Sequence, residues 1–179
     1  MPTDGDRERG PGERTLRDAG LRVTRPRLAV LDAVGDHPHA TTETLIAAAR
    51  TRLPSLSHQA VYDALRVLAD AGVVRRLQPR GSVVRYEARV ADNHHHLVCR
   101  TCGSITDVDC VLGEAPCLLP GPCADGTDPA AGYLLDEAEV TFWGTCPTCA
   151  AAGRAEPAST PTTASRPQQG PATREAHRD

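Results

Sequence analysis

Two Cys-X-X-Cys motifs, Cys99-Arg-Thr-Cys102 and Cys146-Pro-Thr-Cys149, constrain the fold of this 179-residue chain more than any other feature. Each motif directs two thiolates toward one point, and four thiolates make a tetrahedral zinc site. The 43-residue interval between the motifs is longer than in a single zinc ribbon. We therefore expect structural Zn²⁺ to join separate strands of one small domain. A dithiol redox pair is the alternative, but it would need a thioredoxin-like context that is missing here.

Charge divides the chain into two halves. Residues 1–90 carry 15 arginines against 11 acidic residues, whereas residues 91–179 carry 5 against 12. The positive half suits a polyanion, and the negative half, which holds all seven cysteines, suits cations. The sequence shows no secretory signal and no apolar run long enough for a membrane helix. We expect a cytoplasmic protein with no membrane partner, whose cysteines serve metal or redox chemistry rather than a disulfide scaffold.

The first half has the pattern of a helical DNA-binding unit. A short helix is expected over residues 14–19, and three longer helices follow, the third and fourth of the series capped by Thr41 and Ser57. Two strand-like runs, 73–78 and 82–87, flank Pro-Arg-Gly and predict a hairpin. Helices in this order followed by a two-stranded ribbon predict a winged helix-turn-helix.

The second half predicts a smaller domain with strands. Strand formers stand at 97–99, 104–108 and 133–145, and residues 113–132 are rich in Pro and Gly without a regular period. The expected fold class is α+β: a winged helix-turn-helix followed by a small α/β dimerisation domain with structural zinc.

The domain boundaries follow from these patterns. The winged helix is placed at residues 14–90 and the metal-binding domain at 91–149. Residues 1–13 and 150–179 are polar, or rich in small residues, and are expected to be disordered.

The fourth helix presents a polar face away from its apolar stripe, and arginines elsewhere in the first half could neutralise phosphates around it. An ordinary solvated face is the alternative, but the wing and the local positive charge favour DNA. The expected DNA-binding residues are Ser57, His58, Gln59, Tyr62, Arg66, Arg17, Arg25 and Arg76.

Three consecutive histidines precede the first cysteine motif. In an extended segment His94 and His96 face one side and His95 faces the other. Glu87 and Asp107 flank the pair in sequence, and His39 could approach from the helical unit. Nitrogen and oxygen ligands without thiolate suit divalent iron, manganese, nickel or zinc, so the pattern indicates a second metal site.

Cys110, Cys117 and Cys123 lack such partner spacing. We interpret them as plain thiols, with a secondary redox role as the alternative.

Four stretches give the chain a specific resemblance to the ferric uptake regulator family over about residues 14–149. They are GLRVTRPR at 20–27, SHQAVYDAL at 57–65, NHHHLVCRTCG at 93–103 and CPTC at 146–149. Three further stretches, DNHHH at 92–96, DVDC at 107–110 and LDEAEV at 135–140, resemble the FurA/CatR branch, peroxide-responsive repressors of catalase-peroxidase genes.

The resemblance implies a homodimer whose winged helices bind a palindromic, AT-rich operator, with Tyr62 contacting bases. It maps structural Zn²⁺ onto Cys99, Cys102, Cys146 and Cys149. It also maps a regulatory metal, Fe²⁺ or Mn²⁺, onto His39, Glu87, His94, His96 and Asp107.

Aspartate at position 107 is typical of the family's peroxide sensors, in which bound Fe²⁺ reduces peroxide and a ligand histidine is oxidised. A third metal site of some relatives would use His95 and Glu114, but its expected histidine is absent around Ala138, so we do not assign it.

Two other functions fit parts of the pattern. An iron, zinc or nickel homeostasis repressor would have the same architecture and similar ligands. A zinc enzyme would use a metal-activated water, but the four-thiolate site is closed and no HExxH motif is present. We therefore expect a transcriptional repressor and no enzymatic activity.

Overall fold

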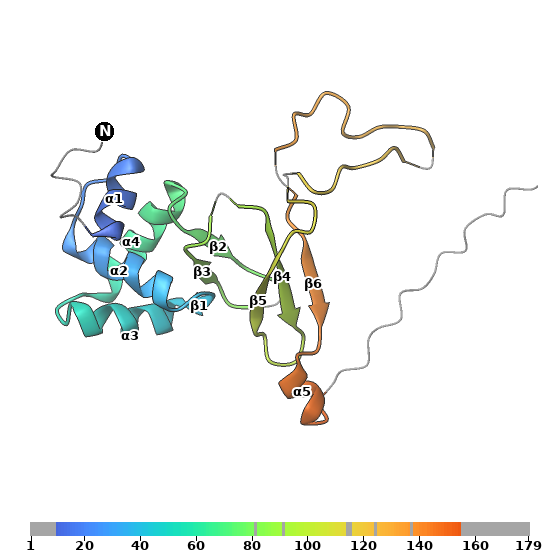
Figure 1. Ribbon diagram of the computed structural model, residues 1–179. Coiled ribbons are helices and arrows are strands. Elements are labelled where there is room, and N and C mark those ends of the chain that lie inside the picture. The colour runs from blue at the N-terminus through green and yellow to red at the C-terminus, as the bar shows by residue number, and fades with distance from the viewer. Residues whose placement is uncertain are drawn as a thin grey trace, which may run out of the picture.

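The computed structural model describes residues 10–80, 82–90, 92–113, 116–123, 125–136 and 138–154. Four helices form its N-terminal lobe (Figure 1): α1 Pro11–Asp18, α2 Arg25–Asp36, α3 Thr42–Arg52 and α4 His58–Asp70. Helix α1 begins three residues before the expected start at residue 14. Pro11 stands at its N-terminus, where the missing N–H costs no hydrogen bond, so residues 11–13, which we had assigned to a disordered end, belong to the helix.

Side-chain caps define where the helices begin. The Thr41 hydroxyl accepts from the Thr44 N–H at 3.4 Å, and the Ser57 hydroxyl accepts from the Ala60 N–H at 3.1 Å. Each bond satisfies an N–H that the first helical turn leaves without a partner, worth about 1 kcal/mol. Both predicted caps are confirmed.

The apolar core lies among these helices. Leu16, Val30, Leu45, Val61 and Leu68 are fully buried there. Each comes from the periodic apolar face of its helix, and burial of one such side chain stabilises the fold by about 1.5–3 kcal/mol. The helical lobe therefore has a core of its own.

The predicted wing is present and has one strand more than expected. Strands β2 Arg75–Leu77 and β3 Arg85–Glu87 pair antiparallel, and β1 Ala40–Thr41 pairs with the other edge of β3. Two residues are too few for a periodic pattern, so β1 could not be predicted from sequence. Its pairing fixes the chain around residue 39 against β3.

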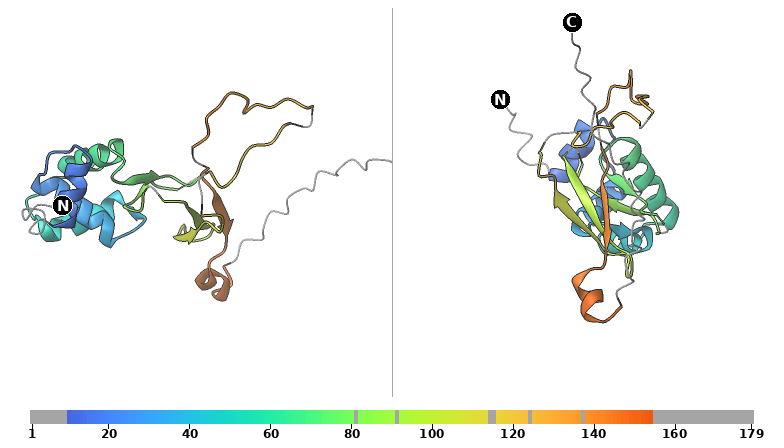
Figure 2. Two further views of the ribbon diagram at one scale, coloured as in Figure 1. Left: turned by 45° about the horizontal axis from the view of Figure 1, so that its top comes forward. Right: turned by 90° about the vertical axis from the view of Figure 1, so that its right-hand side faces the viewer.

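A second three-stranded sheet follows the wing. Its strands are β4 His94–Cys99, β5 Ile105–Asp109 and β6 Thr141–Gly144, in the order β5-β4-β6, and the short helix α5 Pro147–Ala151 follows β6. Strand β5 is antiparallel to β4, and β6 is parallel to it. Figure 2 shows this sheet and the helical lobe as two units joined through the wing.

The strand expected over residues 133–145 is wrong in its first part, because only Thr141–Gly144 is a strand. Tyr133 and Leu134 are 71% and 100% exposed, and among the described residues no strand pairs with them. Helix α5 extends through residues 150 and 151, which we had placed in the disordered tail. Within the two expected disordered ends, residues 1–9 and 155–179 lie outside the described part of the chain. Within the described residues, no helix is long and apolar enough to cross a bilayer.

Candidate metal centres and nucleic-acid surface

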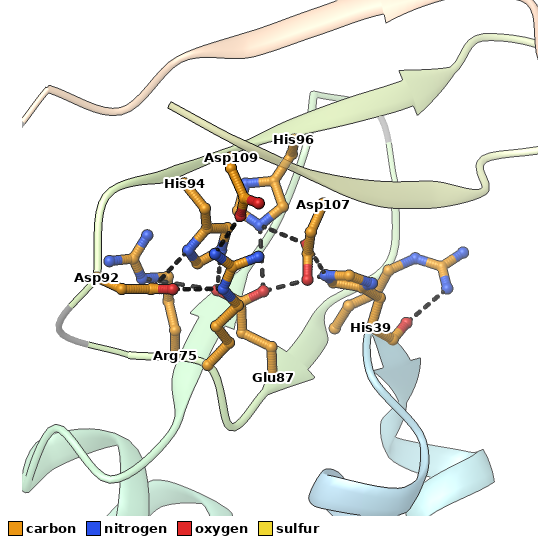
Figure 3. Close-up of polar contacts among 10 residues, drawn as sticks. His39, Arg75, Glu87, Asp92, His94, His96, Asp107 and Asp109 are labelled. Atoms are coloured by element: carbon orange, nitrogen blue, oxygen red, sulfur yellow. Dashed lines mark hydrogen bonds and ion pairs between the residues drawn. The ribbon is translucent and has the colours of Figure 1, made fainter. Parts of the chain in front are cut away.

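Nitrogen and oxygen donors from both units converge between the wing and the second sheet (Figure 3). His39 comes just before β1, Glu87 ends β3, His96 lies on β4 and Asp107 lies on β5. One donor atom from each of these four side chains lies within 4.8 Å of the others. We refer to this set as the nitrogen–oxygen cluster.

Glu87 stands at the middle of the cluster. Its Oε2 atom lies 3.0 Å from His39 Nε2 and 3.1 Å from His96 Nε2. Asp107 Oδ1 lies 2.8 Å from His39 Nε2 and 3.6 Å from His96 Nε2. Two imidazoles therefore face two carboxylates at distances from which modest side-chain movement would bring all four onto one ion.

The fifth expected ligand, His94, lies at the edge of this cluster. Its Nε2 atom is 3.4 Å from Glu87 Oε1, and its Nδ1 atom is 2.8 Å from Asp92 Oδ1. The His94 side chain is fully buried. Asp92, which sequence analysis did not assign to the site, therefore fixes the ring so that Nε2 points at Glu87, in the way that an outer carboxylate orients a ligand histidine.

The backbone at His39 is held in an unusual conformation. His39 has φ 58°, and it is the only non-glycine residue with positive φ in the described part of the chain. The Arg85 guanidinium donates to the His39 carbonyl at 2.9 Å, and the His39 N–H donates to the Tyr86 carbonyl at 2.9 Å. Such backbone costs energy and persists where its surroundings determine it. Arg85 and strand β3 therefore determine where the imidazole points.

The charges in the cluster stabilise each other. Burial alone would raise the pKa of Glu87, but hydrogen bonds from His39 and His96 outweigh it and lower the pKa to about 2. Burial alone would lower the pKa of His39, but the hydrogen bond to Glu87 and the charge of Asp107 raise it above 6.5. A proton on His39 and the Arg75 guanidinium, 3.7 Å from Glu87 Oε1, thus place positive charge beside the buried carboxylates.

Three ligand atoms of the cluster are buried without an aligned hydrogen bond in the described residues, although each lies in an ion pair: Glu87 Oε1, His94 Nε2 and Asp107 Oδ1. Their lone pairs are therefore available to a cation. Imidazole and carboxylate donors that converge in this way suit a divalent ion such as Fe²⁺, Mn²⁺ or Zn²⁺.

The four motif cysteines form a second cluster. Their sulfur atoms lie within 4.8 Å of one another, and Cys102 Sγ is 3.8 Å from Cys146 Sγ. Zinc–sulfur bonds of about 2.3 Å in a tetrahedron put two sulfurs about 3.8 Å apart. The prediction that the two motifs meet at one point is confirmed by this geometry, which fits Zn²⁺.

Backbone N–H groups prepare this cluster for a cation. Hydrogen bonds from the N–H groups of Cys146 and Cys102 lower the pKa of Cys99 to about 6, whereas burial raises the pKa of Cys149 to about 12. The buried Cys149 thiolate therefore needs a positive charge beside it. A metal ion shared with Cys99 would supply that charge.

A third cluster was missed from sequence. Cys110 and Cys117, interpreted as plain thiols, have their sulfur atoms within 4.8 Å of each other and of a His95 ring nitrogen. A spacing of seven residues matches no metal-ligand motif, so no signal in the sequence indicates that these two cysteines lie together. Cys123 is exposed, as a plain thiol would be.

The predicted DNA-binding residues are all exposed, and four of them share one hollow beside helix α4 and the wing. Gln59, Tyr62, Arg66 and Arg76 line this hollow, with Tyr62 47% exposed. Asp63 accepts from the Gln59 amide at 3.0 Å, which explains an acidic residue on this face. Two more of the predicted DNA-binding residues stand at the start of α4, where Ser57 is the helix cap and His58 is the first helical residue. The last two, Arg17 on α1 and Arg25 on α2, do not line the hollow.

Comparison with known proteins identifies the family. The model of the ferric uptake regulator family matches residues 18–112. The chain is 62% identical over 134 residues to the transcriptional regulator FurA of Mycobacterium tuberculosis, covering 75% of this chain and 86% of that protein. It is 35% identical over 94 residues to the peroxide-responsive repressor PerR of Staphylococcus aureus, covering 52% of this chain and 63% of that protein.

A solved structure agrees with these matches. The crystal structure of the Vibrio cholerae ferric uptake regulator aligns with a TM-score of 0.54 and 28% identity, covering 75% of this chain and 98% of that one. The chain belongs to the ferric uptake regulator family, whose matched members are transcriptional regulators and not enzymes.

Proposed function

We propose that this protein is a metal-dependent, peroxide-responsive repressor that binds palindromic, AT-rich operator DNA as a homodimer. Its targets would be catalase-peroxidase or other oxidative-stress genes. The observation that carries the proposal is the nitrogen–oxygen cluster, because His39 and Glu87 come from the winged-helix unit and His96 and Asp107 from the second sheet. Fe²⁺ or Mn²⁺ held there, with His94 as a fifth ligand, would join the two units.

Metal binding would act on DNA affinity through linkage. An ion that binds only the arrangement in which all donors meet stabilises that arrangement by RT ln(1 + [L]/Kd), about 2.7 kcal/mol at a hundredfold excess over Kd. In a dimer, this arrangement fixes the relative position of the two recognition helices and thus their match to half-site spacing. The regulatory metal is therefore expected to increase operator affinity.

Structural Zn²⁺ on Cys99, Cys102, Cys146 and Cys149 would hold the second unit together. Among the described residues, this unit buries few apolar side chains of its own and exposes several large ones. Val111, Leu112, Leu118 and Phe142 are 99%, 65%, 59% and 47% exposed. Apolar surface of this kind marks an association surface, which supports homodimerisation through this unit.

Peroxide response rests on the ligand set. Asp107 is the residue typical of peroxide sensors in the family, and FurA and PerR relatives match the chain. Fe²⁺ held by these residues would supply one electron to peroxide, and the oxidant formed would take its remaining electrons from an adjacent ligand imidazole. Loss of His39 or His94 as a ligand would weaken the contact between the units and lower DNA affinity.

DNA contact would be made by helix α4. Its exposed Tyr62 and Gln59 would contact base edges, and Arg66 and Arg76, which border the same hollow, would contact phosphates. Ser57, His58, Arg17 and Arg25 complete the proposed surface.

The test is a titration of operator binding in gel-shift assays with Fe²⁺ or Mn²⁺, each with and without peroxide. We expect both metals to promote binding and peroxide to release only the Fe²⁺ form. Release of both forms would instead indicate thiol oxidation, and release of neither would indicate a metal homeostasis repressor.

A variant pair makes this test specific to the cluster. His94→Ala should weaken metal-dependent binding, whereas His37→Ala, which removes an exposed histidine two residues before His39, should not. Unchanged metal dependence and peroxide release in His94→Ala would overturn the ligand assignment.

A further inference from the structure

The third cluster, His95 with Cys110 and Cys117, lies on the opposite face of β4 from the nitrogen–oxygen cluster. Side chains alternate along a strand, so His95 points away from His94 and His96. The His95 Nε2 atom lies 3.3 Å from Cys117 Sγ, and one donor atom from each of the three side chains lies within 4.8 Å of the others.

The backbone fixes two of the three donors. His95 is paired with Val108 in the middle of the β4–β5 ladder. The Cys110 N–H donates to the Asn93 carbonyl at 3.1 Å, which attaches the residue after β5 to the start of β4. A turn in which the Gly113 N–H donates to the Cys110 carbonyl at 3.2 Å then redirects the chain. His95 and Cys110 thus belong to the sheet, and Cys117 reaches them from the connecting segment.

The imidazole of His95 is buried without its full set of partners. The residue is 7% exposed, and its Nδ1 atom is buried with no hydrogen bond to any described residue. The ring edge meets Phe142 at a centroid distance of 6.2 Å, which supplies packing but no hydrogen bond. The polar contact that the described residues give this ring is therefore the one from Nε2 to Cys117 Sγ, so the nitrogen that faces a thiol is Nε2.

We propose that His95, Cys110 and Cys117 form a Zn²⁺ site, separate from both the four-cysteine cluster and the nitrogen–oxygen cluster. A donor set of two thiolates and one imidazole binds Zn²⁺ in preference to the harder ions Mn²⁺ and Fe²⁺. In tetrahedral zinc sites a sulfur and a nitrogen ligand lie about 3.5 Å apart, close to the 3.3 Å between Cys117 Sγ and His95 Nε2.

Charge balance favours the same ion. Two thiolates and one Zn²⁺ sum to zero, so the buried imidazole faces a neutral group rather than an isolated charge. Three protein ligands leave a fourth position for water or another donor. A Zn²⁺ ion bound at this site would hold Cys117 against strand β4.

The experiment uses the full-length chain, kept reduced and free of oxygen and loaded with ¹¹³Cd²⁺ as a probe for the zinc sites. Cadmium resonances move with the number of thiolate ligands, so a four-thiolate, a two-thiolate and a nitrogen–oxygen site are resolved separately. Wild-type protein should give a resonance between those of the four-thiolate and nitrogen–oxygen sites. Elemental analysis of the Zn²⁺ form should show one more ion per chain than in the Cys117→Ser variant.

Variants assign the resonance. Cys117→Ser and His95→Gln should each remove it and keep the four-thiolate resonance, which shows that the second unit is folded. Cys123→Ser, which removes an exposed cysteine of the same connection, should keep both. The proposal is overturned if wild-type protein gives no intermediate resonance or if the resonance survives Cys117→Ser. It is also overturned if Cys110 and Cys117 are isolated as a disulfide and the two thiols released by its reduction do not bind Cd²⁺.

Discussion

The Nε2 atom of His39 lies 3.0 Å from the Oε2 atom of Glu87, across 48 residues of sequence. The same carboxylate oxygen lies 3.1 Å from His96 on the second sheet. Glu87 therefore connects the helical lobe to the sheet through two histidines. Without a metal ion, each of these contacts is a hydrogen bond between an imidazole nitrogen and the carboxylate. A metal ion would compete with the shared proton for the same nitrogen and oxygen atoms.

This competition predicts a pH-dependent metal affinity. His39 has a raised pKa, so its protonation stabilises the metal-free fold below the unfolded-state pKa, and this contribution is lost as pH rises through the folded-state pKa. Glu87, with a pKa of about 2, stays ionised throughout. Mn²⁺ affinity should fall about tenfold per pH unit below the His39 pKa for one displaced proton. Calorimetry in buffers of different ionisation enthalpy measures both the affinity and the proton release.

The control for this effect is His37, an exposed histidine two residues away. His37→Ala should reproduce the wild-type pH profile, whereas His39→Ala should bind weakly with a flatter profile. The range from about pH 6 to about pH 8 begins just below the reference histidine pKa of about 6.5 and extends above it. A wild-type Mn²⁺ affinity that stays constant over this range would contradict the prediction.

Arg85 positions His39 for this role. Its guanidinium donates to the His39 carbonyl at 2.9 Å and supports the positive φ of that residue. A hydrogen bond from a charged group contributes about 1.5–3 kcal/mol. We expect Arg85→Ala to let His39 relax and to weaken Mn²⁺ binding about tenfold, as measured by titration without DNA. Arg80→Ala, at the exposed tip of the wing, should leave the affinity unchanged.

The sequence predicted the elements that have a local signal. The caps at Thr41 and Ser57 are local, because each hydroxyl bonds an N–H three residues later. The spacing within each cysteine motif is local as well, and the expectation of one four-thiolate site predicted that the two motifs meet. The alternation along β4 also separated His94 and His96 from His95 correctly.

Features that depend on tertiary contact were missed. Strand β1 exists because Ala40 and Thr41 pair with β3, which no two-residue pattern reveals. The left-handed backbone of His39 depends on Arg85, 46 residues away. Cys117 meets His95 across 22 residues of sequence, a contact that no local pattern reveals. The expected strand through Tyr133 failed because strand formers there find no neighbour to pair with.

Zinc retention at the four-cysteine cluster should depend on Cys149. Burial raises the pKa of this thiol to about 12, so binding a metal ion near neutral pH must release its proton. We expect Cys149→Ser to hold one zinc ion fewer than wild type after dialysis against a chelator, and to lower the thermal unfolding midpoint. Elemental analysis and calorimetry measure these effects, with Cys123→Ser as the control. Equal zinc content in Cys149→Ser and wild type would disprove this role.

Tyr62 should contribute to operator affinity without affecting the metal. It is 47% exposed on α4, beside Gln59, whose amide is held by Asp63. Base contacts of this kind contribute about 1–3 kcal/mol, so Tyr62→Ala should weaken operator binding by about ten- to a hundredfold, while Mn²⁺ affinity stays at the wild-type value.

The salt dependence distinguishes a base contact from a phosphate contact. Tyr62→Ala removes no charge, so the slope of log K against log salt should stay unchanged, whereas Arg76→Ala should reduce that slope by about one. Tyr133→Ala, in the exposed connection of the second unit, should alter neither quantity. If Tyr62→Ala lowered affinity for operator and random DNA equally, Tyr62 would be a backbone contact, and recognition of the operator would have to reside in other residues of α4.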